Sequence, residues 1–222
     1  MSTFKGKTAW VSSADRYMGP AIATELERLG VLVTRDTDRL YTDAHLQSEL
    51  SEIPDIVIAN LAEPPKKGPV EHIEDSDWET LFDHLVHPLM RIVRHVSRAM
   101  KERGHGKIVA VTSAAPLRGI PFASAYCAAR GAQNAFIKGV GLELAKFGVQ
   151  VNGIGQNYIE NDTYYPPDLM QDERFIQVLN TQVPTKKVGS SLETAKLAAY
   201  LADPDVKHVV GQIIPLAGGW TT

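Results

Sequence analysis

Residues 107–130, KIVAVTSAAPLRGIPFASAYCAAR, join a buried strand to the start of a long helix. The first part, KIVAVTS (107–113), is an apolar, β-branched run of the kind found in strands that are buried on both faces. A helical stretch over 124–147 follows after a short connection containing Pro and Gly. This order of strand and helix is the unit from which parallel sheets are built.

The same alternation runs along the whole chain. Stretches with helical character lie at 19–29, 43–50, 76–103, 124–147, 172–181 and 191–202. Short β-branched runs suited to buried strands lie between them: TAWVSS (8–13), VLVTRD (31–36), DIVIAN (55–60), KIVAVTS (107–113), VQVNGIG (149–155) and GQIIPL (211–216). The pattern predicts an α/β fold, a doubly wound parallel sheet with helices on both faces, in one domain over residues 1–222.

In such sheets, ligands bind beyond the carboxyl ends of the strands. Four polar residues fall at or just after predicted strand ends: Ser13, Asn60, Ser113 and Gln156. We therefore expect the functional site at this edge.

Composition sets limits on function. A chain of 222 residues with 44% hydrophobic residues can bury one large core, and its net charge of −3 provides no field for nucleic acid or an anionic membrane. The single Cys127 excludes an internal disulfide and suits a reducing compartment. The start MSTFKGKTAW does not resemble a signal peptide, so a cytoplasmic protein is expected. His84 and His87 lack further ligands at metal-binding spacing, so no metal site is predicted.

Ser113, Tyr126 and Arg130 form a candidate catalytic set. Tyr126 and Arg130 are four residues apart on the predicted helix, so their side chains lie one turn apart on one face. A cation beside a phenol favours the phenolate, which can act as a base. The hydroxyl of Ser113 can hold the substrate oxygen whose proton Tyr126 takes. The set predicts a site for proton abstraction.

A Ser, a Tyr thirteen residues later and a basic residue four further on resemble the catalytic core of the short-chain dehydrogenases/reductases. Ordinary members have Lys where this chain has Arg130. The Ser–Tyr–Arg version resembles the halohydrin dehalogenases, a non-redox branch of that superfamily. The resemblance runs from VSSADRYMG (11–19) to GGWTT (218–222) and implies a Rossmann-like domain.

The turn after the first strand distinguishes redox from non-redox members. Nucleotide-binding members carry Thr-Gly-x3-Gly-x-Gly, whose glycines let the backbone approach a pyrophosphate. Here only Gly19 remains, because Ser13 and Tyr17 stand at the other two positions. Halohydrin dehalogenases carry Thr-x4-Phe/Tyr-x-Gly, with the ring filling the nucleotide space, and Ser12 stands where they have Thr. The resemblance implies that no cofactor is used and that the domain lacks a functional dinucleotide site.

Three further positions bear on the same choice. Leu85 stands where dehydrogenases usually carry a catalytic Asn, and Gln156-Asn157 replaces the usual Pro-Gly beside the nicotinamide. Asp36 ends the second predicted strand, where an acidic residue can bind an adenosine ribose. We interpret Asp36 instead as a solvated turn residue.

The resemblance also implies a halide site. Backbone N–H groups of Gln156, Asn157, Tyr158 and Ile159 could form a nest for a small anion, an arrangement that the residues alone favour no more than ordinary packing. Ring edges of Tyr17 and Tyr165 are expected beside it. The implied reaction converts a vicinal haloalcohol to an epoxide and halide, and its reverse opens epoxides with small anions.

Two alternatives remain open: an NAD(P)-dependent oxidoreductase with Arg130 in place of Lys, and a non-catalytic Rossmann-like sensor. Related proteins suggest a homotetramer through the helices at 76–103 and 124–147. The apolar residues available there for core or interface are Leu81, Leu85, Leu89, Ala132 and Phe136.

Overall fold

A computed structural model describes residues 3–221. Within this range the chain forms a six-stranded sheet in the order β2-β1-β3-β4-β5-β6, with every neighbouring pair parallel. The strands are β1 (Thr8–Val11), β2 (Leu32–Arg35), β3 (Ile56–Asn60), β4 (Gly106–Ser113), β5 (Val149–Gln156) and β6 (Ile213–Leu216). The predicted doubly wound α/β domain is confirmed.

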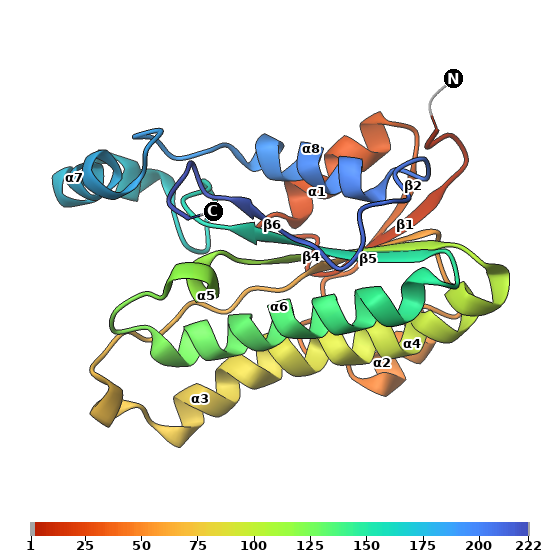
Figure 1. Ribbon diagram of the computed structural model, residues 1–222, viewed down its shortest axis with the longest axis horizontal. Coiled ribbons are helices and arrows are strands. Elements are labelled where there is room, and N and C mark those ends of the chain that lie inside the picture. The colour runs from red at the N-terminus through yellow and green to blue at the C-terminus, as the bar shows by residue number, and fades with distance from the viewer. Residues whose placement is uncertain (1–2, 222) are drawn as a thin grey trace.

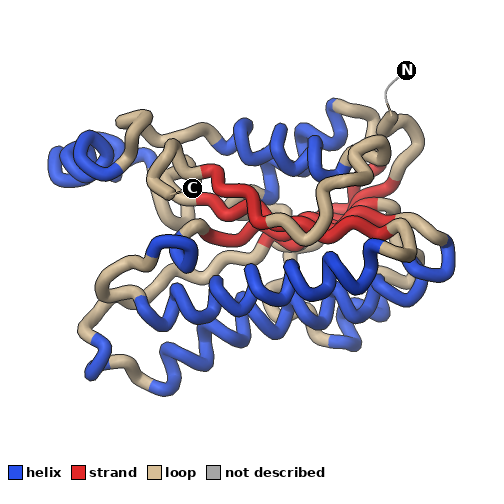
Figure 2. The backbone as a smooth tube through the Cα atoms, in the orientation of Figure 1, coloured by secondary structure: helices blue, strands red, loops and turns tan. Residues whose placement is uncertain are grey.

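Helices cover both faces of the sheet (Figure 1). On one face lie α1 (Gly19–Arg28) and α8 (Ser191–Ala202), and on the other lie α2 (Asp43–Glu49), α4 (His87–Arg103) and α6 (Ser124–Ala145). Figure 2 shows the sheet as the middle of three layers. The shorter helical segments are η1 (Val70–His72), α3 (Asp75–Leu81), η2 (Phe82–Val86), α5 (Ala115–Arg118), η3 (Pro167–Gln171) and α7 (Glu173–Gln182).

The helix predicted over 76–103 is interrupted. Residues Phe82–Val86 form the π-helical segment η2 between α3 and α4. Pro88, at the start of α4, has no N–H to donate, and its ring crowds the carbonyl one turn earlier. This explains why the regular hydrogen-bond ladder breaks here, and π-helical turns of this kind are frequent at functional sites.

The carboxyl edge of the sheet gathers the predicted polar residues. Asn60, Ser113 and Gln156 are the last residues of β3, β4 and β5, and Ser113 pairs in register with Gln156. Of the apolar residues expected in core or interface, Leu81, Leu85 and Leu89 are buried in the chain's own core, while Ala132 and Phe136 are partly exposed. Within residues 3–221 no helix combines the length and the apolar character needed to cross a bilayer.

Gly19 packs α1 against the strand edge. A Cβ atom at this position would lie 2.5 Å from the Ser13 carbonyl oxygen and 2.7 Å from the Ala14 Cα, both backbone atoms that cannot move aside. We expect Gly19→Ala to lower the free energy of unfolding by about 1–3 kcal/mol, as overpacking does. The matched control is Gly139→Ala in α6, where the Cβ meets open space and should stabilise the helix by about 0.5–1 kcal/mol. Urea denaturation measures both, and equal stabilities of the two variants would contradict this packing role.

Candidate active site

The β1–α1 turn keeps a glycine-like backbone without the glycines. Ser13 has φ 45° and Tyr17 has φ 56°, both in the left-handed region that side chains other than glycine rarely adopt. Ser12 ties the turn to the neighbouring strand, because its hydroxyl accepts a hydrogen bond from the Asn60 N–H (2.8 Å). The Asn60 side chain in turn donates to the carbonyls of Ser13 and Arg16.

Two N–H donors at the start of this turn are already used inside the protein. The Ser13 N–H donates to the hydroxyl of Tyr41 (2.5 Å), a fully buried residue that sequence reasoning missed. The Ala14 N–H donates to the Asp36 carbonyl (2.7 Å). A pyrophosphate bound at this turn would need such donors free.

The interpretation of Asp36 as a solvated residue is wrong. Its side chain is buried and its Oδ2 lies 2.7 Å from the His45 Nε2, while Oδ1 accepts from the Asp38 N–H. Both carboxylate oxygens are therefore engaged inside the protein. The short helix α2, which carries His45, supplies this partner.

A cavity of about 420 Å³ lies at the carboxyl edge. It brings together most of the residues singled out in the sequence: Tyr17, Ser113, Tyr126, Gln156, Asn157, Tyr158 and Tyr165. Two of the predicted residues are not on its wall. Ile159 is buried elsewhere, and Arg130 lies behind Tyr126.

Arg130 is fully buried on α6 and forms four hydrogen bonds. Its Nε donates to the Tyr126 hydroxyl (3.1 Å) and its Nη2 to the Tyr164 hydroxyl (3.0 Å). Its Nη1 donates to Gln133 Oε1 (2.8 Å) and, at 3.4 Å, to the Val111 carbonyl. Across residues 3–221 no carboxylate lies within ion-pair distance of this guanidinium. The expected contact between cation and phenol is thus present, inside a shell of neutral acceptors.

Two members of this shell were missed in the sequence. Gln133 links Arg130 to the interrupted helix, because its Nε2 donates to the Leu85 carbonyl in η2 (2.6 Å). Gln133 lies three residues after Arg130, so the two share one face of the helix, and this spacing was the signal that could have found it. Tyr164 carried no such signal, since only the fold brings it to Glu63, whose N–H donates to its hydroxyl and whose carbonyl accepts from it (both 3.0 Å).

The aromatic rings beside Tyr126 are neutral donors. Burial raises the pKa of Tyr17, Tyr164 and Tyr165 above the ordinary tyrosine value. Burial also opposes the charge on Arg130, but nearby Tyr126, Tyr164 and Tyr17 raise its pKa overall, which keeps it a cation. The Tyr17 ring lies 5.2 Å from the Tyr164 ring, centroid to centroid. The cavity therefore has a permanent positive charge behind Tyr126 and three further phenols, all uncharged, close to that charge.

Ser113 is held ready to donate. Its Oγ accepts a hydrogen bond from the Ala115 N–H (3.0 Å), and among the described residues its own O–H donates to none. Asn134, four residues after Arg130, donates to the Ser113 carbonyl (3.2 Å) and fixes the strand end. A substrate oxygen in the cavity can thus receive the Ser113 proton in a hydrogen bond.

The 156–159 loop differs from the predicted nest. The Asn157 N–H donates to the Leu216 carbonyl (3.1 Å) and the Tyr158 N–H to the Asn157 side chain (3.0 Å). These two amides are therefore not free for an anion, whereas the Ile159 N–H has no hydrogen-bond partner within the described part of the chain. Tyr165 donates to Asn157 Oδ1 (2.5 Å), which joins the loop to the aromatic wall. No cluster of three metal-ligating side chains occurs among the residues that the structure describes.

Comparison with known proteins gives the family. The model of the family described as enoyl-(acyl carrier protein) reductase matches residues 20–221. The chain belongs to the short-chain dehydrogenase/reductase superfamily. The predicted superfamily is thus confirmed, and sequence and fold together indicate an enzyme of that superfamily.

Its relatives and structural neighbours include a reductase and dehalogenases. Nodulation protein G of Rhizobium sp. (strain N33) is 26% identical, with 99% of this chain and 98% of that protein covered. The 3-oxoacyl-(acyl-carrier-protein) reductase of Escherichia coli (strain K12) is 24% identical over 97% of this chain and 98% of its own. Among solved structures, a protein described as a dehalogenation enzyme is 25% identical with a TM-score of 0.92, covering 99% and 100% of the two chains. A halohydrin dehalogenase bound to ethyl (2S)-oxiran-2-ylacetate is 22% identical, with a TM-score of 0.88 and 97% of each chain covered.

The Gln133 bridge gives a prediction for stability. Gln133→Leu leaves the Leu85 carbonyl without its side-chain donor and removes one acceptor from the buried Arg130. Because an unsatisfied buried polar group costs about 1–3 kcal/mol, we expect a loss of that size in urea denaturation. The control Gln47→Leu alters an exposed glutamine of α2 and should change stability by less than about 0.5 kcal/mol. Equal effects of the two substitutions would show that the bridge does not support the buried cation.

Proposed function

We propose that this protein converts vicinal haloalcohols into epoxides and halide without a nucleotide cofactor. The observation that carries the proposal is the hydrogen bond from the buried, carboxylate-free Arg130 to Tyr126, whose ring lines the cavity beside Ser113. The likeness to a dehalogenation enzyme over the whole chain supports it.

The first step is proton removal. Ser113 donates a hydrogen bond to the hydroxyl oxygen of the substrate, and Tyr126, as the phenolate, takes the proton. Arg130 stabilises that phenolate because an adjacent cation lowers the energy of the anionic form. Gln133 and Tyr164 hold the guanidinium in place and supply no charge of their own.

Ring closure follows within the substrate. The alkoxide oxygen forms a bond to the neighbouring carbon while the carbon–halogen bond breaks, and the halogen leaves with the bonding pair as halide. Attack within one molecule already has a high effective molarity, so the protein mainly positions the groups and stabilises charge. In reverse, a small anion opens the epoxide and Tyr126 returns the proton to the oxygen.

We place the leaving halide between Tyr17 and the segment Gln156–Ile159. Neutral phenols and aromatic ring edges of Tyr17 and Tyr165 offer positive partial charge to an anion. The Ile159 N–H has no partner among the described residues, but Ile159 does not line the cavity, so the tyrosines are the donors in this proposal. Such a site attracts halide through partial charges. A full cation at the same place would bind the halide more strongly and slow halide release.

The direct test supplies purified protein with a simple vicinal bromoalcohol and no added nucleotide. Bromide and proton release in equal amounts, together with epoxide formation, is the expected result. Absence of all three at millimolar substrate would refute the proposal.

Substitutions at the catalytic set should separate its roles. Tyr126→Phe removes the titrating oxygen, so turnover should fall at least about 100-fold. Arg130→Lys keeps the charge but changes its reach and geometry, so turnover should weaken. Cys127→Ser is the matched control, since this neighbouring side chain does not line the cavity. Turnover that survives in Tyr126→Phe would remove Tyr126 from the mechanism.

Nucleotide binding should be weak or absent. Tyr17, Ser13 and Tyr41 occupy the space and the donors that a dinucleotide would use. We expect isothermal calorimetry to detect no binding of NAD⁺, NADP⁺, NADH or NADPH at micromolar concentrations. Micromolar affinity for any of them would instead favour the oxidoreductase alternative.

We also propose a homotetramer that associates through α4 and α6. Leu142 on α6 is 74% exposed, which leaves an apolar residue available for a partner. Light scattering should then give four times the 24.3 kDa mass of one chain. A monomer at micromolar concentration would contradict this assembly.

A further inference from the structure

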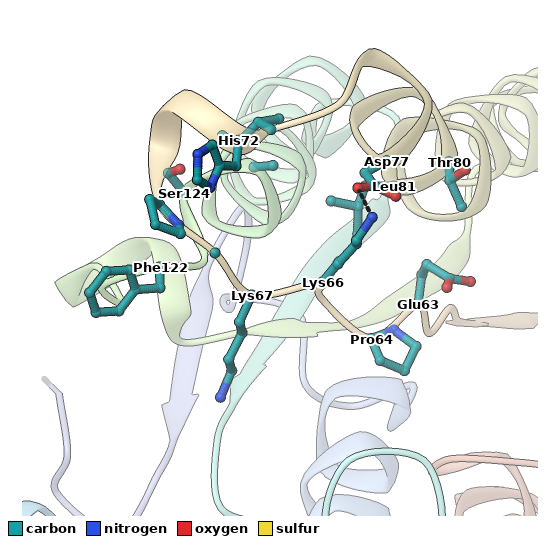
Figure 3. Close-up of a pocket in the computed structure, with 14 residues that line it drawn as sticks. Glu63, Pro64, Lys66, Lys67, His72, Asp77, Thr80, Leu81, Phe122 and Ser124 are labelled. Carbon is teal, nitrogen blue, oxygen red and sulfur yellow. Dashed lines mark ion pairs between the residues drawn. The ribbon is translucent and has the colours of Figure 1, made fainter.

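A second cavity, of about 330 Å³, adjoins the catalytic one (Figure 3). It is built mainly from the loop that follows β3 and from the residues just before Tyr126, and its walls include Glu63, Lys66, His72, Asp77 and Ser124. The two cavities share Pro64 and Lys67 as lining residues. Lys67 therefore stands at the junction between them.

Charge within the catalytic cavity is one-sided. Among the described residues on its wall, Lys67 is the one charged side chain, and none is acidic. A group that brings a negative charge into this cavity would meet Lys67 and no opposing carboxylate. A neutral substrate would make no use of that cation.

The neighbouring charges are paired, and Lys67 is not. Lys66 Nζ lies 2.9 Å from Asp77 Oδ2, and Glu63 Oε2 lies 2.7 Å from His84 Nδ1. No ion pair or hydrogen bond of the Lys67 ammonium occurs within the described residues. In Figure 3, Lys66 reaches to Asp77, whereas Lys67 leaves the loop in another direction.

The loop that carries Lys67 is constrained. Pro64, Pro65 and Pro69 fix the backbone φ angle on both sides of it. The Gly68 N–H donates to the Phe122 carbonyl (2.9 Å), which ties the loop to the segment leading into α6. The base of the Lys67 side chain is thereby held in a set position relative to Tyr126.

We propose that Lys67 binds an anionic substituent of the substrate, so that the preferred substrates are haloalcohols or epoxides bearing a carboxylate. The reacting carbons lie at Ser113 and Tyr126, and the carboxylate lies at the junction with the second cavity. This inference rests on the proposed dehalogenation and specifies its substrate class.

The test compares 4-chloro-3-hydroxybutanoate with its methyl ester, which differ in one charge. We expect the wild-type protein to show a lower KM for the acid. Lys67→Gln should raise that KM about fivefold, the scale of a partly exposed ion pair, and leave kcat and the KM of the ester within about twofold. Lys67→Arg should retain the preference and Lys67→Glu should reverse it. Lys66→Gln is the matched control from the same loop and should leave the preference intact.

A KM for the acid that does not respond to Lys67→Gln would overturn the inference, as would equal changes for acid and ester. If the wild-type protein dehalogenates neither compound, the proposed function fails, and the anion site is then tested by binding alone. Calorimetry measures the affinity for 3-hydroxybutanoate and for its methyl ester, two compounds without a halogen whose binding does not depend on dehalogenation. Tighter binding of the acid, abolished in Lys67→Gln, supports the anion site, and equal binding of acid and ester refutes it.

Discussion

The rest of the site depends on one buried charge, the guanidinium of Arg130. An ionised group removed from water is costly unless it is paired, and this one has only neutral acceptors around it. Neutral acceptors solvate the charge without cancelling it. The anion that can balance it is one formed at the Tyr126 oxygen or passed on to the substrate oxygen. A carboxylate beside Arg130 would have cancelled the charge beforehand and removed this preference.

Three separate parts of the fold meet at that charge. Helix α6 carries Arg130 and Gln133 on its buried face, and η2 presents the Leu85 carbonyl to Gln133 where the helix ladder is broken. The loop after β3 holds Tyr164 through the backbone of Glu63. The same loop continues to Lys67, so the segment that holds Tyr164 beside Arg130 also carries the cation shared by the two cavities. In the proposed reaction, one short stretch of chain would thus link positioning to substrate choice.

The sequence predicted the elements that repeat and the residues that carry a spacing signal. Alternating strands and helices predicted the sheet and its layers. The interval between Ser113 and Tyr126 predicted one cavity wall, and the interval between Tyr126 and Arg130 predicted the cation behind it. Contacts between segments far apart in the chain could not be predicted from the sequence. Tyr41 reaches Ser13 and Tyr164 reaches Arg130 only after the strands are in order, and no local pattern distinguishes them from ordinary buried rings. For a similar reason the sequence could not show that β6 and the Asn157 side chain take up two of the amides expected in the 156–159 nest.

The backbone of the β1–α1 turn determines where the Tyr17 ring lies. Ser13 and Tyr17 have positive φ angles, a conformation that glycines adopt without strain. Holding side chains there has a conformational cost, and the hydrogen bonds of Ser13 to Tyr41 and the packing of the Tyr17 ring against Tyr164 offset it. The Tyr17 ring lines the cavity that contains Tyr126. In the proposed function, this one residue both excludes a nucleotide from the turn and forms the wall that receives the departing halide.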